Sequence, residues 1–568
     1  MFEPTGKTSV TSRLFSNGPV VTILLSLLLL FAVWRRWNRG SQQHHGLSPP
    51  QLRETIPYVS NAFQFMTNKK AFIARATEAL EKSPGHIIQY QLGPMKMYLM
   101  GNATTNVHAA IFRSAFTADP WILRIMENAG YQPSDLATLS ADTTGNASVP
   151  YRPRRRGSDI EKDAPTKNQP QQQERVWYPL HKMYDENLVS AKAVDKLAPY
   201  YQTFWIEQLP SVEQGWIEDV KVGDFIKSHM THAATKTIFG SLILEVNPGF
   251  VDAFWGFEKH VETLTIGLPD WLNQPAIRGR NKFRGMCRKW FELADTQYDW
   301  TRSDTPDWEP VFGSGVAKGL AGWAKSLGFK ADTMGPLYIL FFFGLHANPI
   351  PIGTWMVMEL LKDPALLQAV KEEVSQCYLD DDPKRLDHRK LQTMPLLQSI
   401  HAETLRLHMG VLLTRTCTED VTIAGYTFPK GSVFQAPTEV GHLDETVWGA
   451  PGHPASDFWA YRHTKEVTVP NEKTGEIKKQ LQFSMDKRSG SFFPYGGGGP
   501  TCPGRNFAKA ELFLTVGVLV SRVEMEFVEW LNPDGSHSDR APSTGANYAN
   551  AVAAGPDRDV KVRWRRVW

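Results

Sequence analysis

One cysteine, Cys502, lies in a sequence context that suits a metal-bound thiolate. It belongs to the stretch FFPYGGGGPTCPGRNFA, in which glycines precede the cysteine and an amphipathic segment follows it. Glycines adopt positive φ and let backbone approach a flat ligand, while backbone N–H groups can point at the sulfur. A helix whose first turn holds Pro503 would place its partial positive charge near the sulfur and lower the thiol pKa. The residues therefore predict a buried thiolate ligand.

Two other interpretations of this loop stay open on these residues alone. A glycine-rich loop before a helix can cradle phosphate, although no Gly-Lys-Ser/Thr ends this loop and no strand precedes it. A plain buried cysteine is also common, because a free cysteine packs as a small hydrophobe. The other cysteines, Cys287, Cys377 and Cys417, form no CxxC pair and no disulfide framework. Any thiol chemistry therefore involves a single cysteine.

A second candidate set is the charged pair Glu403 and Arg406 in HAETLRLH. Residues three apart share one face of a helix, so the two side chains can form an ion pair. An E-x-x-R pattern alone is weak evidence, because it arises often by chance. The pair predicts a contribution to the architecture around a site, not to catalysis.

Together these motifs resemble those of the cytochrome P450 family of haem-thiolate monooxygenases. The cysteine loop is similar to the family signature F-x-x-G-x-[R/H]-x-C-x-G, with Tyr495 at the aromatic position, Gly498 and Gly504 at the glycines and Cys502 at the ligand. Pro500 occupies the position of the usual basic residue. The resemblance implies haem b, iron protoporphyrin IX, with the Cys502 thiolate as its axial ligand.

The family pattern also implies a partner for Glu403 and Arg406. In the family this pair joins an arginine in a segment F-x-P-x-R-F, which Arg462 in DFWAYRH matches, with Ala460 and His463 as departures. The resemblance thus implies a structural network around the cofactor pocket.

Three further residues resemble the family's contacts to the haem propionates. Arg415, in TRTCTEDVTIAGYTFPKG, aligns with a propionate-binding arginine. Trp177 and His181 resemble a W-x-x-x-R pair, with His181 in place of the arginine. These residues are expected to bind the cofactor.

The segment GLHANPIPIGTW departs from the family's usual oxygen-activating helix. Ala347 stands where most relatives carry an acid, and Asn348 where they carry an alcohol. The pattern N-x-x-P followed by Trp355 resembles the branch that includes cholesterol 7α-hydroxylase, sterol 12α-hydroxylase and prostacyclin synthase. Pro349 and Pro351 interrupt the helical hydrogen bonds and predict a kink. Asn348 is expected to take part in catalysis, to satisfy carbonyls that the prolines free, or both.

The resemblance implies a monooxygenase that uses O2 and electrons from NADPH, delivered by NADPH-cytochrome P450 reductase. Asn348 and Cys502 are the expected catalytic residues. The expected substrate is apolar: a polycyclic terpenoid, a sterol-like molecule or another secondary metabolite, as for fungal members of the family. A reductase-independent peroxide isomerase of the prostacyclin synthase type and a non-catalytic haem sensor or carrier remain alternatives. The expected substrate pocket comprises Phe343, His346, Ala347, Val411 and Leu412.

The elements that must position these residues are mostly helical. Apolar residues recur at helical spacing, and an alternating run over 421–429 predicts a short strand pair. The expected fold class is mainly α with a minor β region, a cytochrome P450 fold preceded by one N-terminal transmembrane helix. Helices are predicted over residues 337–361, 364–378, 394–408 and 507–523.

The N-terminal region predicts a membrane anchor. PVVTILLSLLLLFAVW is uncharged, and Arg35, Arg36 and Arg39 follow it, which favours a cytosolic C-terminal side. We expect a single-pass protein of the endoplasmic reticulum membrane, with the bilayer as a partner. With 62 Lys and Arg against 59 Asp and Glu, the net charge of +3 gives no reason to expect nucleic-acid binding. The predicted organisation is a tail (1–18), an anchor (19–37), a proline-rich hinge (38–57) and a catalytic domain (58–568) with a solvated insertion loop (142–174).

Overall fold

The computed structural model of the 568-residue chain describes most of the region predicted to be catalytic. The predicted tail, the anchor and nearly all of the insertion loop lie outside the described residues, as does the first half of the hinge. The described residues are 48–101, 115–142, 145, 175–266, 270–302, 306–470, 477–486, 488–498, 500–545 and 552–568.

The predicted mainly helical fold with a minor strand component is confirmed, and the four helices predicted by periodicity are present, the first of them as two segments. The helices are α2 (Ser60–Thr67), α3 (Lys69–Glu81), α5 (Asp119–Ala129), α6 (Pro133–Ala141), α7 (Trp177–Tyr184), α8 (Ala191–Ile206), α9 (Val222–Phe239), α10 (Leu242–Glu245), α11 (Phe250–Glu258), α12 (Val261–Ile266), α13 (Gln274–Gln297), α14 (Gly315–Ser326), α15 (Ala331–His346), α16 (Pro349–Lys362), α17 (Pro364–Ser375), α18 (His388–Leu391), α19 (Pro395–His408), α20 (Thr438–His442), α21 (Glu445–Trp448) and α22 (Arg505–Arg522).

The strands form two larger sheets and three short hairpins. A five-stranded sheet has the order β1-β2-β10-β7-β3, and a four-stranded sheet has the order β14-β13-β15-β4. The predicted pair near residue 425 is the hairpin β8–β9. The strands are β1 (Ile87–Leu92), β2 (Met95–Met100), β3 (Phe116–Thr117), β4 (Ile217–Lys221), β5 (Trp308–Glu309), β6 (Gly313–Ser314), β7 (Leu412–Cys417), β8 (Val421–Ile423), β9 (Tyr426–Phe428), β10 (Val433–Pro437), β11 (Thr464–Pro470), β12 (Ile477–Phe483), β13 (Val523–Leu531), β14 (His537–Ser538) and β15 (Asp559–Arg566).

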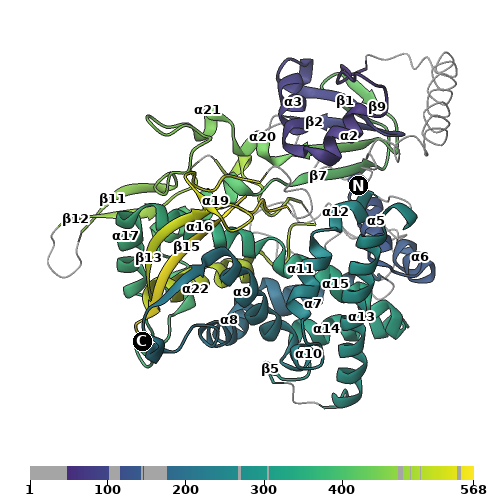
Figure 1. Cartoon of the computed structure of the whole chain (residues 1–568). Coiled ribbons are helices and arrows are strands. Elements are labelled where there is room, and N and C mark those ends of the chain that lie inside the picture. Colours follow the sequence, from purple (N-terminus) through teal and green to yellow (C-terminus); the bar gives the residue numbers. More distant parts are fainter. Residues whose placement is uncertain are drawn as a thin grey trace, which may run out of the picture.

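The five-stranded sheet and helices α2 and α3 form one end of the molecule, and the long helices lie in the rest together with the four-stranded sheet (Figure 1). The chain joins this sheet earlier than the sequence predicts. Leu52 N–H donates to Gln89 O at 2.8 Å, and Gln89 N–H donates to Pro50 O at 2.9 Å. The second half of the predicted hinge is therefore partly fixed against β1, because its backbone groups complete the edge of the sheet.

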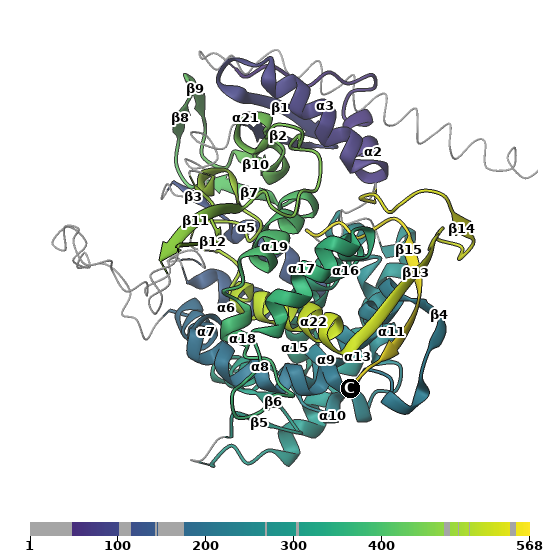
Figure 2. The same cartoon turned by 90° about the vertical axis from the view of Figure 1, so that its left-hand side faces the viewer.

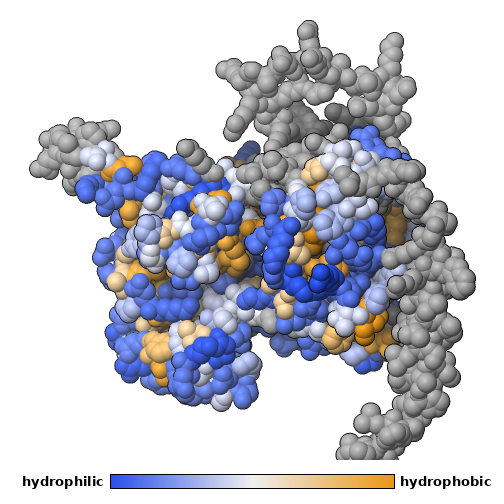
Figure 3. All heavy atoms as spheres, turned by 90° about the horizontal axis from the view of Figure 1, so that it is seen from above, coloured by the Kyte–Doolittle hydropathy of each residue, from blue (hydrophilic) through white to orange (hydrophobic). Residues whose placement is uncertain are grey.

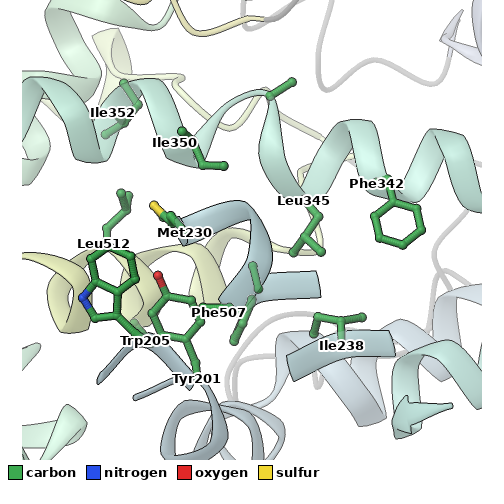
Figure 4. Packing of buried hydrophobic residues seen from close by; sticks show 14 of the residues in the cluster. Tyr201, Trp205, Met230, Ile238, Phe342, Leu345, Ile350, Ile352, Phe507 and Leu512 are labelled. Carbon is green, nitrogen blue, oxygen red and sulfur yellow. The ribbon is translucent and has the colours of Figure 1, made fainter. Parts of the chain in front are cut away.

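Helix α22, which follows the cysteine loop, runs through the middle of the helical body (Figure 2). Figure 4 shows how its residues pack: Leu512 lies near Trp205 and Tyr201 of α8 and Met230 of α9. The Tyr201 hydroxyl is 2.6 Å from Thr515 Oγ1 of α22, so the polar end of this buried ring is hydrogen-bonded. This packing holds the start of α22, and with it the cysteine loop, in a rigid frame.

The predicted kink in the distal helix is a complete break. Helix α15 ends at His346, Ala347 and Asn348 form a turn, and α16 begins at Pro349. Proline is favoured at the first position of a helix because the N–H it lacks would have no partner there. Among the described residues, the combined run 331–362 is long and apolar enough to cross a membrane, but 67% of its most apolar window is buried inside the protein.

On the face seen in Figure 3, hydrophilic residues cover most of the described surface, and hydrophobic residues lie in small separate patches. Scattered patches of this size are normal for a globular protein.

Candidate active site

The cysteine loop closes on itself just before α22. Cys502 N–H donates to Tyr495 O at 3.0 Å, which brings the two ends of the glycine run together. Gly496 and Gly498 have φ of +72° and +76°, a left-handed conformation that favours glycine. Helix α22 begins at Arg505, with Gly504 as its N-cap, so Pro503 lies just before the helix and not in its first turn. The glycines are therefore needed for the path that presents the sulfur.

The Cys502 sulfur is open to a cavity, yet it lies deep inside the protein. The depth governs its protonation: burial raises the pKa of the thiol, while the N–H groups of Gly504 and Arg505 and the Arg505 guanidinium lower it only in part. The prediction of a lowered pKa is thus wrong in its net direction, because the desolvation of a thiolate outweighs the helix terminus. A coordinated metal cation is what deprotonates such a thiol.

A cavity of about 600 Å³ adjoins Cys502 and collects most of the predicted site residues. It extends between the cysteine loop, α7, α22, β7 and the break in the distal helix, and its surface is mainly apolar. Gly498 does not line it; its carbonyl instead accepts the Thr501 hydroxyl at 2.7 Å. The predicted residues that line the cavity are Cys502, Tyr495, Gly504, Arg415, Trp177, His181, Asn348, Val411 and Leu412.

Three residues predicted for the substrate pocket do not line this cavity: Phe343, His346 and Ala347. His346 is fully buried on another face of α15, where its Nε2 is 3.0 Å from Thr235 Oγ1 of α9. Ala347 lines a second cavity of about 550 Å³. The reason is the 100° rotation per residue of a helix, which turns only one face toward the first cavity. That face carries Leu337, Leu340, Phe341, Gly344, Leu345 and Asn348.

The residues predicted to bind propionates line the cavity, but they differ in how many of their polar groups are already hydrogen-bonded within the protein. Arg415 is buried, and its guanidinium donates to Thr414 O at 2.9 Å and Gly497 O at 3.1 Å. No carboxylate of the described residues lies within ion-pair distance of it, and burial lowers its pKa. The Trp177 indole N–H donates to Leu139 O at 3.2 Å, which leaves the ring and not the N–H for a ligand. Arg415 therefore remains the strongest anion-binding candidate.

The arrangement fits a flat apolar cofactor with an anionic edge. A sulfur donor faces a mainly apolar cavity, and a buried guanidinium without a carboxylate partner lies at the same cavity. A Cβ added to Gly504 would lie 3.8 Å from Cys502 Sγ and would occupy space next to the sulfur. These are the properties that a haem with its propionates requires of a protein site.

Asn348 occupies the turn between α15 and α16 and lines the cavity. Its Oδ1 accepts the N–H groups of Val552 and Ala553 at 3.0 and 3.1 Å. The predicted bond from its amide to carbonyls freed by the prolines is not found among the described residues. The side chain thus fixes the C-terminal region with its oxygen, and its NH2 group has no partner among the described residues.

The structure brings Glu403, Arg406 and Arg462 together in a fully buried network. Arg406 donates to both Glu403 oxygens at 2.8 Å, and Arg462 Nε donates to Oε1 at 2.7 Å. His463, a departure from the family pattern, adds a contact of 3.1 Å between its Nε2 and Glu403 Oε2. Burial alone would raise the Glu403 pKa, but the bonds from Arg406 and His463 outweigh it and lower the pKa to about 2.

Sequence reasoning missed one polar residue of the cavity, Glu511 of α22. Its side chain is almost fully buried, and neither carboxyl oxygen has a hydrogen-bond partner among the described residues. Burial therefore raises its pKa well above 4.5, and the folded protein holds it as a neutral acid. The available signal was a single acid, Glu511, placed directly before the apolar run LFLTVGVLV in a predicted helix.

We expect Glu511→Gln to stabilise the protein at neutral pH. Above pH 4.5 the unfolded chain ionises Glu511 while the folded chain does not, so stability falls as pH rises by at most about 1.4 kcal/mol per pH unit. Glutamine removes this dependence, because it is neutral in both states. Urea unfolding at pH 5 and pH 7 measures it, with Glu372→Gln, at an exposed position of α17, as the control. An equal pH slope in both variants and the unmodified protein would contradict the assignment.

Comparison with known proteins agrees with this site. The sequence model of the family Cytochrome P450 matches residues 338–536. The chain is 36% identical over 526 residues to the cytochrome P450 monooxygenase calL of Penicillium decumbens, covering 92% of this chain and 93% of the relative. It is 26% identical to the cytochrome P450 monooxygenase efuG of Hormonema carpetanum with the same coverage of both chains. Cytochrome P450 7A1 of Sus scrofa is 26% identical over 232 residues, 39% of this chain and 43% of that protein.

The first similarity extends over nearly the whole of both chains, and the family match includes the distal helix, the E-x-x-R pair and the cysteine loop. A site built for a thiolate-bound apolar cofactor lies in that same region. The chain therefore belongs to the cytochrome P450 family and is an oxygenase whose family cofactor is a haem held by a cysteine thiolate.

Proposed function

We propose that this protein is a monooxygenase that inserts one oxygen atom of O2 into an apolar substrate, with electrons from NADPH delivered by NADPH-cytochrome P450 reductase. The observation that carries the proposal is the position of Cys502 at a large, mainly apolar cavity whose other wall is the broken distal helix. Thiolate-bound haem supplies O2 activation, because the axial sulfur donates electron density that favours O–O cleavage. The protein supplies the ligand, the enclosure and the orientation of the substrate.

The proposal assigns roles to residues on both sides of the cavity. Cys502 is the axial ligand, and Tyr495, Gly498 and Gly504 shape the loop that carries it. Arg415 binds a propionate, supported by its lack of a carboxylate partner. Two further cofactor contacts are assigned on cavity position alone, those of Trp177 and His181.

Asn348 is proposed as a catalytic residue because its side chain lines the cavity and its NH2 group has no partner among the described residues. Its oxygen is already occupied by two backbone N–H groups, which fixes the plane of the amide. A fixed amide would hold a water molecule in the cavity and so supply a proton source in place of the missing acid and alcohol. The same residue thus has a structural role and a catalytic one.

The substrate is proposed to be apolar and polycyclic, of the terpenoid, sterol or related secondary-metabolite type. Support comes from the lining, which includes Leu337, Leu340 and Phe341 on the distal helix and Val411 and Leu412 on the opposite side. A cavity with aliphatic and aromatic walls and few polar groups binds ligands mainly by excluding water. Similarity to other fungal monooxygenases is compatible with this substrate class.

We further propose a single-pass anchor at 19–37 in the endoplasmic reticulum membrane, a stiff proline-rich hinge at 38–57, and a cytosolic catalytic domain. The support is the uncharged segment and the arginines that follow it. The insertion 142–174 is proposed to be a solvated loop.

The experiment that tests the function has two parts. Reduced protein with carbon monoxide should show the red-shifted Soret band of thiolate ligation. With a candidate substrate and the reductase, NADPH and O2 consumption should be coupled to a hydroxylated product. Conversion of a peroxide substrate without NADPH would establish the isomerase instead, and ligation without any turnover would indicate a haem sensor or carrier.

A further inference from the structure

A short segment near the C-terminus forms part of the cavity wall opposite the cysteine loop. We call residues 552–555, VAAG, the C-terminal strap. Its backbone is tied to the end of α19: Gly410 N–H donates to Val552 O at 2.9 Å, and Ala554 N–H donates to His408 O at 2.8 Å. Asn348 Oδ1 accepts the next two strap N–H groups, those of Val552 and Ala553. Almost every strap hydrogen bond is therefore made to a residue distant in sequence.

Two aromatic side chains outside the cavity complete this attachment. The Trp355 indole N–H of α16 donates to Ala554 O at 2.8 Å. Its ring stacks on His408 of α19, with ring centroids 4.0 Å apart and planes within 4°. His408 Nδ1 lies 3.1 Å from Thr544 Oγ1, and burial lowers the His408 pKa to about 3, so the ring is neutral. The stacked pair thus joins α16 to α19. Each ring also has a polar atom close to the C-terminal region: the Trp355 N–H to Ala554 O and His408 Nδ1 to Thr544 Oγ1.

The strap separates two cavities. Val552 lines the cavity that adjoins Cys502, whereas Ala553 and Gly555 line the second cavity of about 550 Å³. Neighbouring residues at the break in the distal helix also line different cavities: Asn348 lines the first cavity and Ala347 lines the second. The wall between the two cavities therefore consists of the strap and of the turn between α15 and α16 to which the strap is hydrogen-bonded.

We propose that Trp355 and His408 are positioning residues that, through the strap, set the shape of the substrate cavity and so its ligand specificity. The inference rests on the proposed function, because that function makes this cavity the substrate site. The indole N–H of Trp355 bonds to Ala554 O, two residues along the strap from Val552, which lines the cavity, so a residue outside the cavity is linked to the cavity wall through the strap backbone. A looser strap would let Val552 move toward the second cavity and would change which ligands fit.

Amide hydrogen exchange tests the attachment directly. In Trp355→Phe a phenyl ring can still stack on His408, but the N–H donor and part of the ring area are lost, so the amides of Val552, Ala553 and Ala554 should exchange roughly five-fold faster or more. The matched control is Trp290→Phe, which loses the same ring area and an equally buried indole bond, to Val311 O at 3.0 Å, away from the strap and the cavity. Equal exchange of the three amides in both variants would overturn the proposal.

A second variant guards against misfolding of the first. Thr544→Val removes the hydroxyl partner of His408 at a partly exposed position and keeps the side-chain shape. It should increase strap exchange in the same direction, by a smaller factor. No increase in either variant would contradict the role of the stacked pair.

Ligand binding to the haem-containing protein tests specificity. Imidazole reaches the iron without filling the cavity, whereas clotrimazole is bulky enough to contact its walls. The ratio of the two dissociation constants, measured by absorbance titration, should shift roughly three-fold or more in Trp355→Phe and stay unchanged in Trp290→Phe. A faster-exchanging strap with an unchanged ratio would refute the specificity role. Loss of the thiolate spectrum in the unmodified protein would refute the proposed function instead, and the exchange result would still stand.

Discussion

Replacing Cys502 by serine is expected to abolish the red-shifted Soret band of the reduced, carbon monoxide-bound protein. A serine hydroxyl is a far weaker ligand and donor than a thiolate, so the electron density that favours O–O cleavage is lost. Product formation should fall by about 10³-fold or more. The side chain faces the cavity and makes no packing contact that serine could not make, so the fold should persist.

The matched control is Cys417→Ser, in strand β7 beside the same cavity. Cys417 is buried, does not line the cavity, and lies in the five-stranded sheet. This variant should retain the spectrum and the activity, with at most a small loss of stability. A Cys502→Ser protein that keeps an unchanged spectrum and makes product would show that another group binds the iron.

Replacing Glu403 by glutamine is expected to destabilise the protein by about 3 to 5 kcal/mol, because two buried arginines lose their shared counter-charge. Both guanidinium groups are fully buried and hydrogen-bonded to loop carbonyls around residues 442–457. Those loops lead toward the cysteine loop, so haem content should fall as well. The midpoint of urea unfolding and the haem absorbance of purified protein measure the two effects.

Glu359→Gln is the control for burial of an acid. Glu359 is buried in α16 and forms one ion pair, 2.7 Å long, with the partly exposed Lys362. Losing that single pair should change stability by about 1 kcal/mol or less. Equal destabilisation by both substitutions would mean that the network around Glu403 contributes no more to the free energy of unfolding than a single ion pair does.

The network also predicts an acid dependence with a definite sign. The Glu403 pKa is about 2 in the folded protein and 4.5 in the unfolded chain, so the unfolded chain takes up the proton first as pH falls. The contribution of Glu403 is therefore complete above pH 4.5 and is lost progressively toward pH 2. Glu403→Gln should lack this component of the acid-induced loss of stability.

Local features of the site could be predicted because they depend on neighbouring residues. The spacing of Glu403 and Arg406 places both on one face of α19, and the bond between them lies within a single helical turn. The glycines before Cys502 predict a loop with positive φ, which Gly496 and Gly498 have. Helices α17, α19 and α22 end within a few residues of their predicted bounds.

Features that depend on distant partners could not be predicted. His346 belongs to the predicted distal helix, but its side chain turns to Thr235 because helix rotation directs position 346 away from the cavity. The thiol pKa of Cys502 is raised, not lowered, because the surrounding protein removes water from the sulfur. For Asn348 the sequence predicts a catalytic role, a bond to carbonyls freed by the prolines, or both, whereas the partners of its Oδ1, Val552 and Ala553, lie 204 and 205 residues away.

The sequence by itself predicted the family, Cys502 as the expected thiolate ligand and the order of the helices, since these depend on residue type and short-range periodicity. Only the tertiary structure decided which helix face meets the cavity, which acid is buried without a partner, and which segment forms the far wall. Those properties arise from desolvation and from contacts between elements hundreds of residues apart, and such contacts leave no periodic pattern in the chain.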